Sequence, residues 1–278
     1  MDLDIDHLKT WIGATRESQD VISPRLANSL AAVLDEAPAF RDGDLPPVGI
    51  HWCLSPDIAP MSGLGIDGHP ARGDFLPPVP LPRRMWAGGE LAFTGEFRVG
   101  DTVTRRSRIA DIAVKTGRSG DLCFVTVTHD YLGPRGPVLS ERHDIVYRPL
   151  ETSGGRPPDE TPPPVPDETY HVEASPVLLA RYSAVTFNGH RIHYDRDYCQ
   201  KEEGYPGLLV HGPLQATLLL RLACRMNDGC VPARFTFRGT APLFDGGRFS
   251  VNMAKVEDGS SLWICSQVGQ VTMRAVAG

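Results

Sequence analysis

The chain has 278 residues, of which 41% are hydrophobic and 22% charged, as in an ordinary globular protein of one or two domains. Its net charge of −6 argues against nucleic acid as the main partner, because phosphate binding needs a basic surface. The sequence contains no run of about 18 apolar residues, so no membrane-spanning helix is expected. The six cysteines form no CxxC pair of the kind typical of structural zinc sites. The start, MDLDIDHLKTWIG, has no apolar secretory segment, so we expect a cytoplasmic protein.

The first half is expected to contain two helices followed by strands. Apolar residues within 5–12 share one helical face, and Ser23-Pro24 is typical of a cap and first turn. Residues 46–89 are rich in Pro and Gly and predict an irregular segment, which in a compact domain is usually functional or wraps a surface. Strands rich in β-branched and aromatic residues are predicted at 90–97, 102–113, 122–131 and 138–147.

Residues 149–168, PLETSGGRPPDETPPPVPDE, predict a stiff, solvated linker because they are dense in proline and almost free of apolar side chains. This linker divides the chain into a domain at 1–148 and a domain at 169–278. The second half repeats the order of elements of the first half, with helices followed by four strands. This repeat favours an internal duplication.

The second half repeats a Ser-Pro helix start at Ser175-Pro176, with a helix to about residue 184. A second helix, from Pro213 to about Met226, is apolar around nearly its whole circumference and predicts burial on most sides. Strands follow at 234–238, 248–256, 262–268 and 271–276. The pattern predicts an α+β protein in which each half wraps an antiparallel sheet round a central helix.

A polar turn, TFNGHRIHYD at residues 186–195, carries the best candidate chemistry. His193 can transfer protons near neutral pH, whereas Asn188 cannot act as a base and can only hold a water or a carbonyl by hydrogen bonds. Asp195 most simply caps a short helix over residues 196–201.

The Gly212 N–H begins the apolar helix, where unpaired backbone donors can stabilise developing negative charge. A base together with such a donor suits enolate chemistry beside a thioester carbonyl. The expected reaction is addition of water to an α,β-unsaturated acyl thioester, or its reversal.

At these residues the sequence resembles a known family. YSAVTFNGHRIHYD at 182–195, followed by GLLVHGPLQ at 207–215, resembles the MaoC-type (R)-specific enoyl-CoA hydratases of the hot-dog fold, in which an Asp precedes the His by five residues. With FLPPVPLPRRMWAGG at 75–89, the chain is most similar to the double-hot-dog branch. That branch includes mitochondrial 3-hydroxyacyl-thioester dehydratase and bacterial mesaconyl-C4-CoA and itaconyl-CoA hydratases. The resemblance covers nearly the whole chain.

The resemblance implies a double hot-dog fold with a catalytic second half and a first half that shapes the acyl pocket. Asn188 stands at the position of the usual hydratase Asp, which implies His193 as the main acid and base, with Asn188 orienting water or thioester and Gly212 as oxyanion donor. The implied substrate is itaconyl-CoA or mesaconyl-C4-CoA, hydrated to citramalyl-CoA. No metal or redox cofactor is expected, since CoA is part of the substrate, and a homodimer is a possible assembly.

Several alternatives stay open. Arg83 and Arg84 either bind a CoA phosphate or substrate carboxylate or are solvated loop charges, and Trp86 either lines the acyl channel or belongs to the core. His211 is a candidate substrate-binding residue or packs beside the helix start. A metal site at residues 190, 193 and 211 is disfavoured, because no Cys or Glu has suitable spacing. Other functions are a straight-chain 3-hydroxyacyl-ACP or -CoA dehydratase, a thioesterase, or a non-catalytic acyl-CoA-binding protein.

Overall fold

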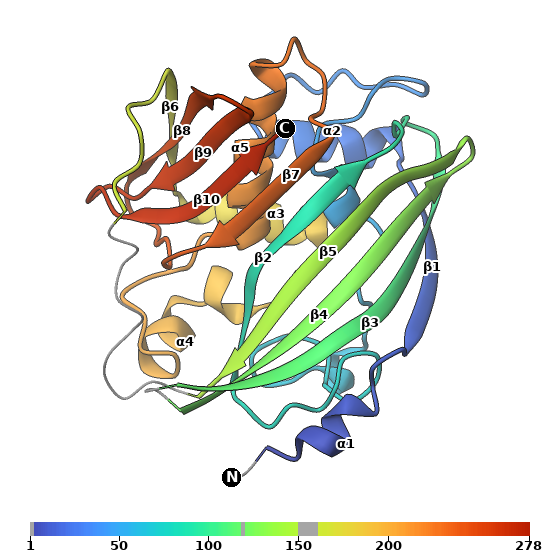
Figure 1. Cartoon of the computed structure of the whole chain (residues 1–278), viewed down its shortest axis with the longest axis vertical. Helices are drawn as coiled ribbons and strands as arrows, with labels where there is room; N and C mark the ends of the chain where they lie inside the picture. Colours follow the sequence, from blue (N-terminus) through green and yellow to red (C-terminus); the bar gives the residue numbers. More distant parts are fainter. Residues whose placement is uncertain (1–2, 118–119, 150–160) are drawn as a thin grey trace.

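The computed structural model describes residues 3–117, 120–149 and 161–278 (Figure 1). In these residues ten strands form one antiparallel sheet, in the order β1-β3-β4-β5-β2-β7-β10-β9-β8-β6. The strands are β1 (Thr15–Val21), β2 (Arg83–Phe93), β3 (Thr102–Gly117), β4 (Gly120–Gly133), β5 (Gly136–Arg148), β6 (Glu168–Glu173), β7 (Arg234–Gly239), β8 (Arg248–Val256), β9 (Gly259–Cys265) and β10 (Val271–Ala277). The first half of the chain supplies β1–β5 and the second supplies β6–β10. The two predicted sheets are therefore halves of one continuous sheet.

The halves join edge to edge, where β2 pairs with β7. Residues 88–92 of β2 lie opposite residues 234–238 of β7 in antiparallel register. Figure 1 shows the two strands side by side at the centre of the sheet. The pairing satisfies backbone groups that each half would otherwise expose on an open edge.

Two helices begin with the expected Ser-Pro pair. At the start of α2 (Pro24–Val33) and of α3 (Pro176–Thr186), the oxygens of Ser23 and Ser175 each accept a hydrogen bond of 3.2 Å from the backbone N–H three residues on. This bond satisfies a donor that the first helical turn leaves unpaired. The two helices pack against each other.

The core of the second half is built on α5 (Gly212–Arg225). Nearly all residues from Leu214 to Cys224 are buried, and the helix packs against β7–β10. In Figure 1, α5 lies with α2 and α3 on one face of the sheet. The predicted burial of this helix on most sides is confirmed.

The first half uses irregular chain where the second half uses α5. Within its described residues, α1 (Ile5–Lys9), the 3₁₀ turns η1 (Ile50–Cys53) and η2 (Met61–Gly63) and the shorter α2 are the only helical elements. A second, smaller core lies where α1 and residues 75–81 cover β3–β5. None of the described helices combines the length and apolarity needed to cross a bilayer.

Three sequence expectations need correction or completion. Residues 83–89 are not irregular, because they form the first part of β2. Strands β1 and β6 were not predicted, since their sequences TRESQDV and ETYHVE are polar and their exposed edge positions give no hydrophobic signal. Most of the predicted linker, residues 150–160, lies outside the described residues, so the domain boundaries stay a prediction.

Candidate active site

The polar turn is held in shape by the end of α3. Phe187 adopts a left-handed conformation (φ 52°) that stops the helix, and the Asn188 N–H then donates to Ser183 O at 2.8 Å. The Asn188 side-chain oxygen accepts from the His190 N–H at 2.9 Å. Asn188 therefore shapes the turn with its oxygen, and its amide NH₂ group remains for a water or a substrate oxygen.

His193 ends the 3₁₀ turn η3 (Arg191–His193) and is buried, with 7% of its surface exposed. Its Nδ1 lies 2.8 Å from Leu209 O, which can only accept, so Nδ1 carries the hydrogen and Nε2 has the free lone pair. Burial lowers the pKa of His193 to about 4, although the Leu209 carbonyl raises it. The ring is therefore a neutral base near pH 7.

His211, the N-cap of α5, packs against the ring of His193. The two rings stack with centroids 3.6 Å apart, and His211 Nε2 lies 2.8 Å from Ser183 Oγ. The His211 ring is 0% exposed, and burial holds its pKa well below the usual value. The ring packs against His193, and a role of His211 in substrate binding stays a prediction.

Gly212 begins α5 and faces an indole ring. A Cβ at this position would lie only 2.7 Å from Trp86 Cε3, so glycine is required for the ring to lie across the helix N-terminus. The Gly212 N–H has no hydrogen-bond partner among the described residues. Trp86 comes from β2, so the first half places a side chain directly at the start of α5.

Trp86 belongs to an aromatic group formed by both halves. Its ring centroid lies 4.7 Å from that of Phe237 and 5.5 Å from that of Trp52. The indole N–H is buried and has no partner among the described residues. The ring is packed against other aromatic rings, and its N–H is left to donate a hydrogen bond to a ligand. This favours the prediction that Trp86 lines the acyl channel.

The two neighbouring arginines differ in their surroundings. Arg83 Nε lies 3.0 Å from the Glu203 carboxylate, and its guanidinium stacks over Tyr205 at 4.9 Å. It is neither a solvated loop charge nor a free anion receptor, because its charge is already paired. Arg84 has no carboxylate within ion-pair distance in the described part of the chain, and its charge lowers the pKa of His143. Arg84 is therefore the better candidate for holding an anion.

The surroundings of the turn also show where the other candidate side chains lie. Asp195 caps α4 (Arg196–Lys201) by accepting from the Tyr198 N–H at 3.0 Å, as predicted. The disfavoured histidine triad is not assembled, since among the described residues the side chains gathered at ligand-like distances are Asp67, His69 and His190. Asp67 and His69 lie in the irregular segment and were missed, because a short DGH sequence in a glycine-rich loop carries no recognisable signal.

A buried polar network in the first half was also missed. Glu141 on β5 accepts hydrogen bonds from Trp52 Nε1 at 2.9 Å and from Tyr131 OH at 3.0 Å. Burial raises the pKa of Glu141, and these two hydrogen bonds oppose the rise. Ser107 Oγ bonds His129 Nδ1 nearby at 2.7 Å. The network was missed because strand alternation predicts apolar side chains on the inward face and gives no signal for polar side chains buried there.

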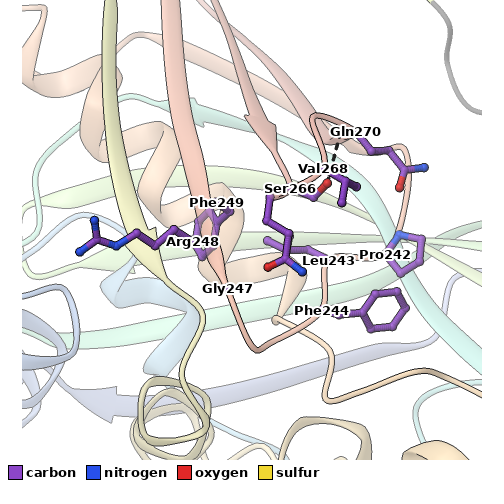
Figure 2. Close-up of a pocket in the computed structure, with 10 residues that line it drawn as sticks. Pro242, Leu243, Phe244, Gly247, Arg248, Phe249, Ser266, Val268 and Gln270 are labelled. Atoms are coloured by element: carbon purple, nitrogen blue, oxygen red, sulfur yellow. Dashed lines mark hydrogen bonds between the residues drawn. The ribbon is translucent and has the colours of Figure 1, made fainter.

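Two surface hollows lie away from these residues. One, of about 80 Å³, is lined by the loop before β8 and the turn between β9 and β10 (Figure 2). The other, of about 420 Å³, is lined by the end of α2, β6, α3 and α5. Neither is lined by His193, Asn188 or Trp86. The candidate catalytic groups instead gather where the turn, the start of α5 and β2 meet.

The chain is similar to known proteins in both sequence and fold. The family model for hydroxyacyl-thioester dehydratase type 2 matches residues 49–245. Mesaconyl-C(4)-CoA hydratase of Chloroflexus aurantiacus is 47% identical over 242 residues, 84% of each chain. A MaoC-like dehydratase structure from Phytophthora capsici has a TM-score of 0.70 at 17% identity and covers 99% of both chains. A Mycobacterium tuberculosis protein described as a double hot dog has a TM-score of 0.57 at 14% identity, with 96% of both chains covered.

The two structural neighbours confirm the double hot-dog fold expected from the sequence. The family model covers residues 49–245, and the 47% identical relative matches 84% of this chain. Together they identify a hydro-lyase that acts on CoA thioesters, and the chain belongs to the hydroxyacyl-thioester dehydratase type 2 family.

Proposed function

We propose that this enzyme adds water reversibly to a branched C5 dicarboxylic acyl-CoA, with mesaconyl-C4-CoA as substrate and citramalyl-CoA as product. The observation that carries the proposal is the 47% identity to mesaconyl-C(4)-CoA hydratase across most of both chains. The half-buried, carboxylate-free guanidinium of Arg84 supports it, since the substrate carries a free carboxylate. Itaconyl-CoA is the alternative substrate within the same class.

In the proposed reaction, His193 Nε2 removes a proton from water as the water oxygen bonds to the β-carbon. The electron pair of the double bond moves toward the thioester oxygen, where the Gly212 N–H stabilises the enolate. The α-carbon then receives a proton as the enolate collapses, which completes the addition of water. The Asn188 amide orients the water or the thioester. CoA serves as the handle of the substrate, and these steps require no metal or redox cofactor.

Arg84 is the proposed receptor for the distal carboxylate. Arg84 lies on β2 two residues before Trp86, whose ring lies against Gly212, and its charge lowers the pKa of His69 and His190. A guanidinium binds a carboxylate through two parallel N–H donors. In mesaconyl-C4-CoA the carboxylate is attached to the β-carbon itself, so a group that holds it also fixes the carbon attacked by water.

The test compares substrates with and without the carboxylate in the Arg84→Gln variant. A charge-assisted hydrogen bond contributes roughly 1.5–3 kcal/mol, so kcat/KM for mesaconyl-C4-CoA should fall about 10- to 100-fold. The rate with crotonyl-CoA, which has no carboxylate, should change little. Loss of enoyl-thioester absorbance measures both rates, and itaconyl-CoA completes the panel.

The matched control is Arg83→Gln, in the neighbouring arginine already paired with Glu203. An equal loss on both substrates in the Arg84 variant, or a selective loss in the Arg83 variant, would contradict the assignment. Faster turnover of straight-chain enoyl thioesters than of mesaconyl-C4-CoA would favour a fatty-acid dehydratase. Binding of CoA without any hydration would favour an acyl-CoA-binding protein. A homodimer and a cytoplasmic location stay predictions.

A further inference from the structure

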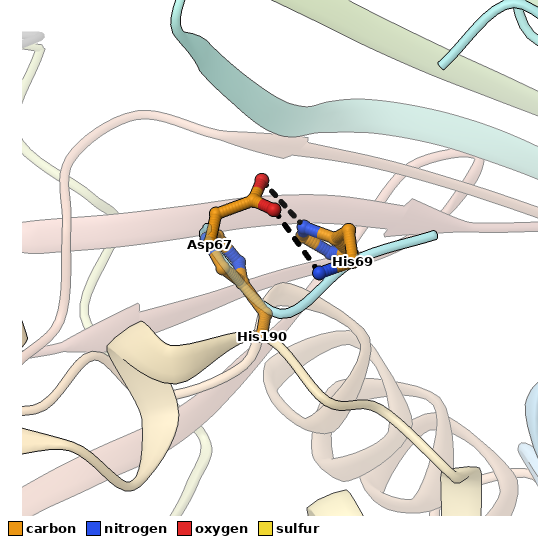
Figure 3. Close-up of side chains that lie close together, drawn as sticks. All are labelled: Asp67, His69 and His190. Carbon is orange, nitrogen blue, oxygen red and sulfur yellow. Dashed lines mark hydrogen bonds and ion pairs between the residues drawn. The ribbon is translucent and has the colours of Figure 1, made fainter. Parts of the chain in front are cut away.

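A cluster of side chains borders His193 through the ring of His190. One side-chain nitrogen or oxygen atom from each of Asp67, His69 and His190 lies within 4.8 Å of the other two (Figure 3). Asp67 Oδ2 lies 3.1 Å from His69 Nδ1, and the His69 ring centroid lies 4.0 Å from that of His190. The His190 ring meets the His193 ring edge-on at 5.5 Å. Three imidazole rings thus lie in contact one after another between a carboxylate and the proposed base, with a hydrogen bond at the carboxylate end.

This cluster is built by close contact between two glycine-containing turns far apart in the sequence. The Arg191 N–H donates to Asp67 O at 2.9 Å, and the Arg191 guanidinium donates to Ile66 O at 3.1 Å. Gly68 has φ +84°, and a Cβ there would collide with the carbonyl oxygen of Gly189. The turns pack this closely only because both residues are glycine, so the cluster is held in place by the backbone.

Only one of the three imidazoles has a carboxylate partner. Burial raises the pKa of Asp67, but the hydrogen bonds and charge of His69 outweigh it and hold that pKa below its usual range. Burial lowers the pKa of His190, and protons on His69 and His193 lower it further. The cluster therefore favours one proton at a time. His69 is the best place for that proton, because its Nδ1–H bonds the carboxylate.

His69 is also the most accessible of these rings. Its side chain is 19% exposed, whereas His190 is 9% and His211 0% exposed. Burial lowers the pKa of His69, the hydrogen bond to Asp67 opposes this, and the charges of Arg84 and Arg72 lower the pKa again. At rest the ring is neutral with Nε2 free, so it can receive a proton during turnover and release it.

Hydration requires two proton transfers, one away from the attacking water and one to the α-carbon. His193 can take the proton from the water that attacks the β-carbon, but the α-carbon must then receive a proton. Asn188 has no titratable group, and His211 is sealed behind His193. Among the described residues around the turn, His69 is the remaining imidazole with both a carboxylate partner and an exposed face.

We infer that Asp67, His69 and His190 form a proton relay for His193, an inference that rests on the proposed hydration reaction. The water oxygen bonds to the β-carbon, the double-bond electrons form the thioester enolate, and the water proton moves to His193 Nε2. The proton passes through His190 to His69, where Asp67 stabilises the imidazolium. His69 then protonates the α-carbon as the enolate collapses. The substrate gains one hydroxyl and one hydrogen, and every side chain returns to its starting state.

The test uses the full-length His69→Gln and Asp67→Asn variants with mesaconyl-C4-CoA and crotonyl-CoA. Loss of a general acid or base lowers turnover about 100-fold or more, so His69→Gln should lower kcat about 100-fold with KM within threefold. Asp67→Asn should lower kcat about tenfold, because the imidazolium loses its partner. Free imidazole in the buffer should restore part of the His69→Gln activity, which a purely structural role would not allow.

His171→Gln, at an exposed histidine on β6, is the matched control and should leave kcat unchanged. The relay is refuted if His69→Gln stays within threefold of the parent, or if its lost activity is not rescued by imidazole. It is also refuted if EDTA abolishes the parent activity and Zn²⁺ restores it, since the cluster would then hold a cation. Turnover of crotonyl-CoA but not mesaconyl-C4-CoA would contradict the proposed substrate alone, and the relay would still be tested on crotonyl-CoA.

Discussion

Replacement of His193 by Asn separates its chemical role from its structural one. The amide nitrogen of Asn can occupy the place of Nδ1, so the hydrogen bond to Leu209 O, 2.8 Å long in the parent, is retained. The basic Nε2 is lost, and loss of a general base lowers turnover about 10²- to 10⁴-fold. We therefore expect kcat to fall at least 100-fold while KM changes little.

The same substitution has a calculable effect on stability. The pKa of His193 is lowered from 6.5 to about 4, so below pH 6.5 the unfolded chain binds a proton that the folded chain does not. At pH 5 this imbalance destabilises the parent by about 2 kcal/mol, at about 1.4 kcal/mol per pH unit. His193→Asn removes this pH-dependent destabilisation, because Asn does not titrate. Its free energy of unfolding should therefore fall less than that of the parent between pH 7 and pH 5.

Turnover is measured by loss of enoyl-thioester absorbance, and stability by urea unfolding at both pH values. His193→Gln is a second variant, because its amide reaches the Nε2 position but cannot accept the proton, and it should be equally inactive. Activity of the Asn variant within fivefold of the parent would refute the role of His193 as base. Identical pH dependence of unfolding in variant and parent would refute the lowered pKa.

Three further changes probe the site and the fold. Gly212→Ala places a methyl group 2.7 Å from Trp86 Cε3, so kcat should fall about 10- to 100-fold and stability by about 1–3 kcal/mol. Gly239→Ala, whose Cβ would meet nothing closer than 3.6 Å, is the control, and equal effects in both variants would contradict the steric explanation. Asn188→Ala removes the acceptor for the His190 N–H and should lower kcat about tenfold. Asn188→Asp keeps that acceptor and should restore the melting temperature. Unchanged kinetics in the Ala variant would show that Asn188 is a structural residue only. Finally, the free energy of unfolding, measured by urea titration, should fall from pH 6.5 to pH 5, because each buried histidine whose pKa is lowered contributes a slope of up to about 1.4 kcal/mol per pH unit, and a flat profile would contradict this. The buried histidines with a lowered pKa include His51, His129, His190, His193 and His211.

Local sequence signals predicted the helix starts well. A serine oxygen and a following proline satisfy the first turn through atoms within four residues, so Ser23 and Ser175 could be recognised without any tertiary information. The same holds for the Asp195 cap of α4. The apolar circumference of α5 predicted its burial, because only a helix surrounded by protein tolerates apolar residues on every side.

The motif around Asn188 and His193 could be recognised for a similar reason, since both side chains lie on one short turn. What the sequence could not establish is which nitrogen of His193 is free. That assignment follows from the carbonyl of Leu209, which lies sixteen residues further along the chain.

The sequence by itself therefore determined the elements with local causes: capped helices, a buried helix, apolar strands and the turn that carries His193. Only the tertiary structure decided how the halves join through β2 and β7, why Gly212 must be glycine beneath Trp86, and that Asp67 and His69 lie beside the turn. The physical reason is the range of the interactions. Caps and amphipathic patterns act over a few residues, whereas sheet pairing, ring packing and coupled protonation depend on groups that only folding brings together.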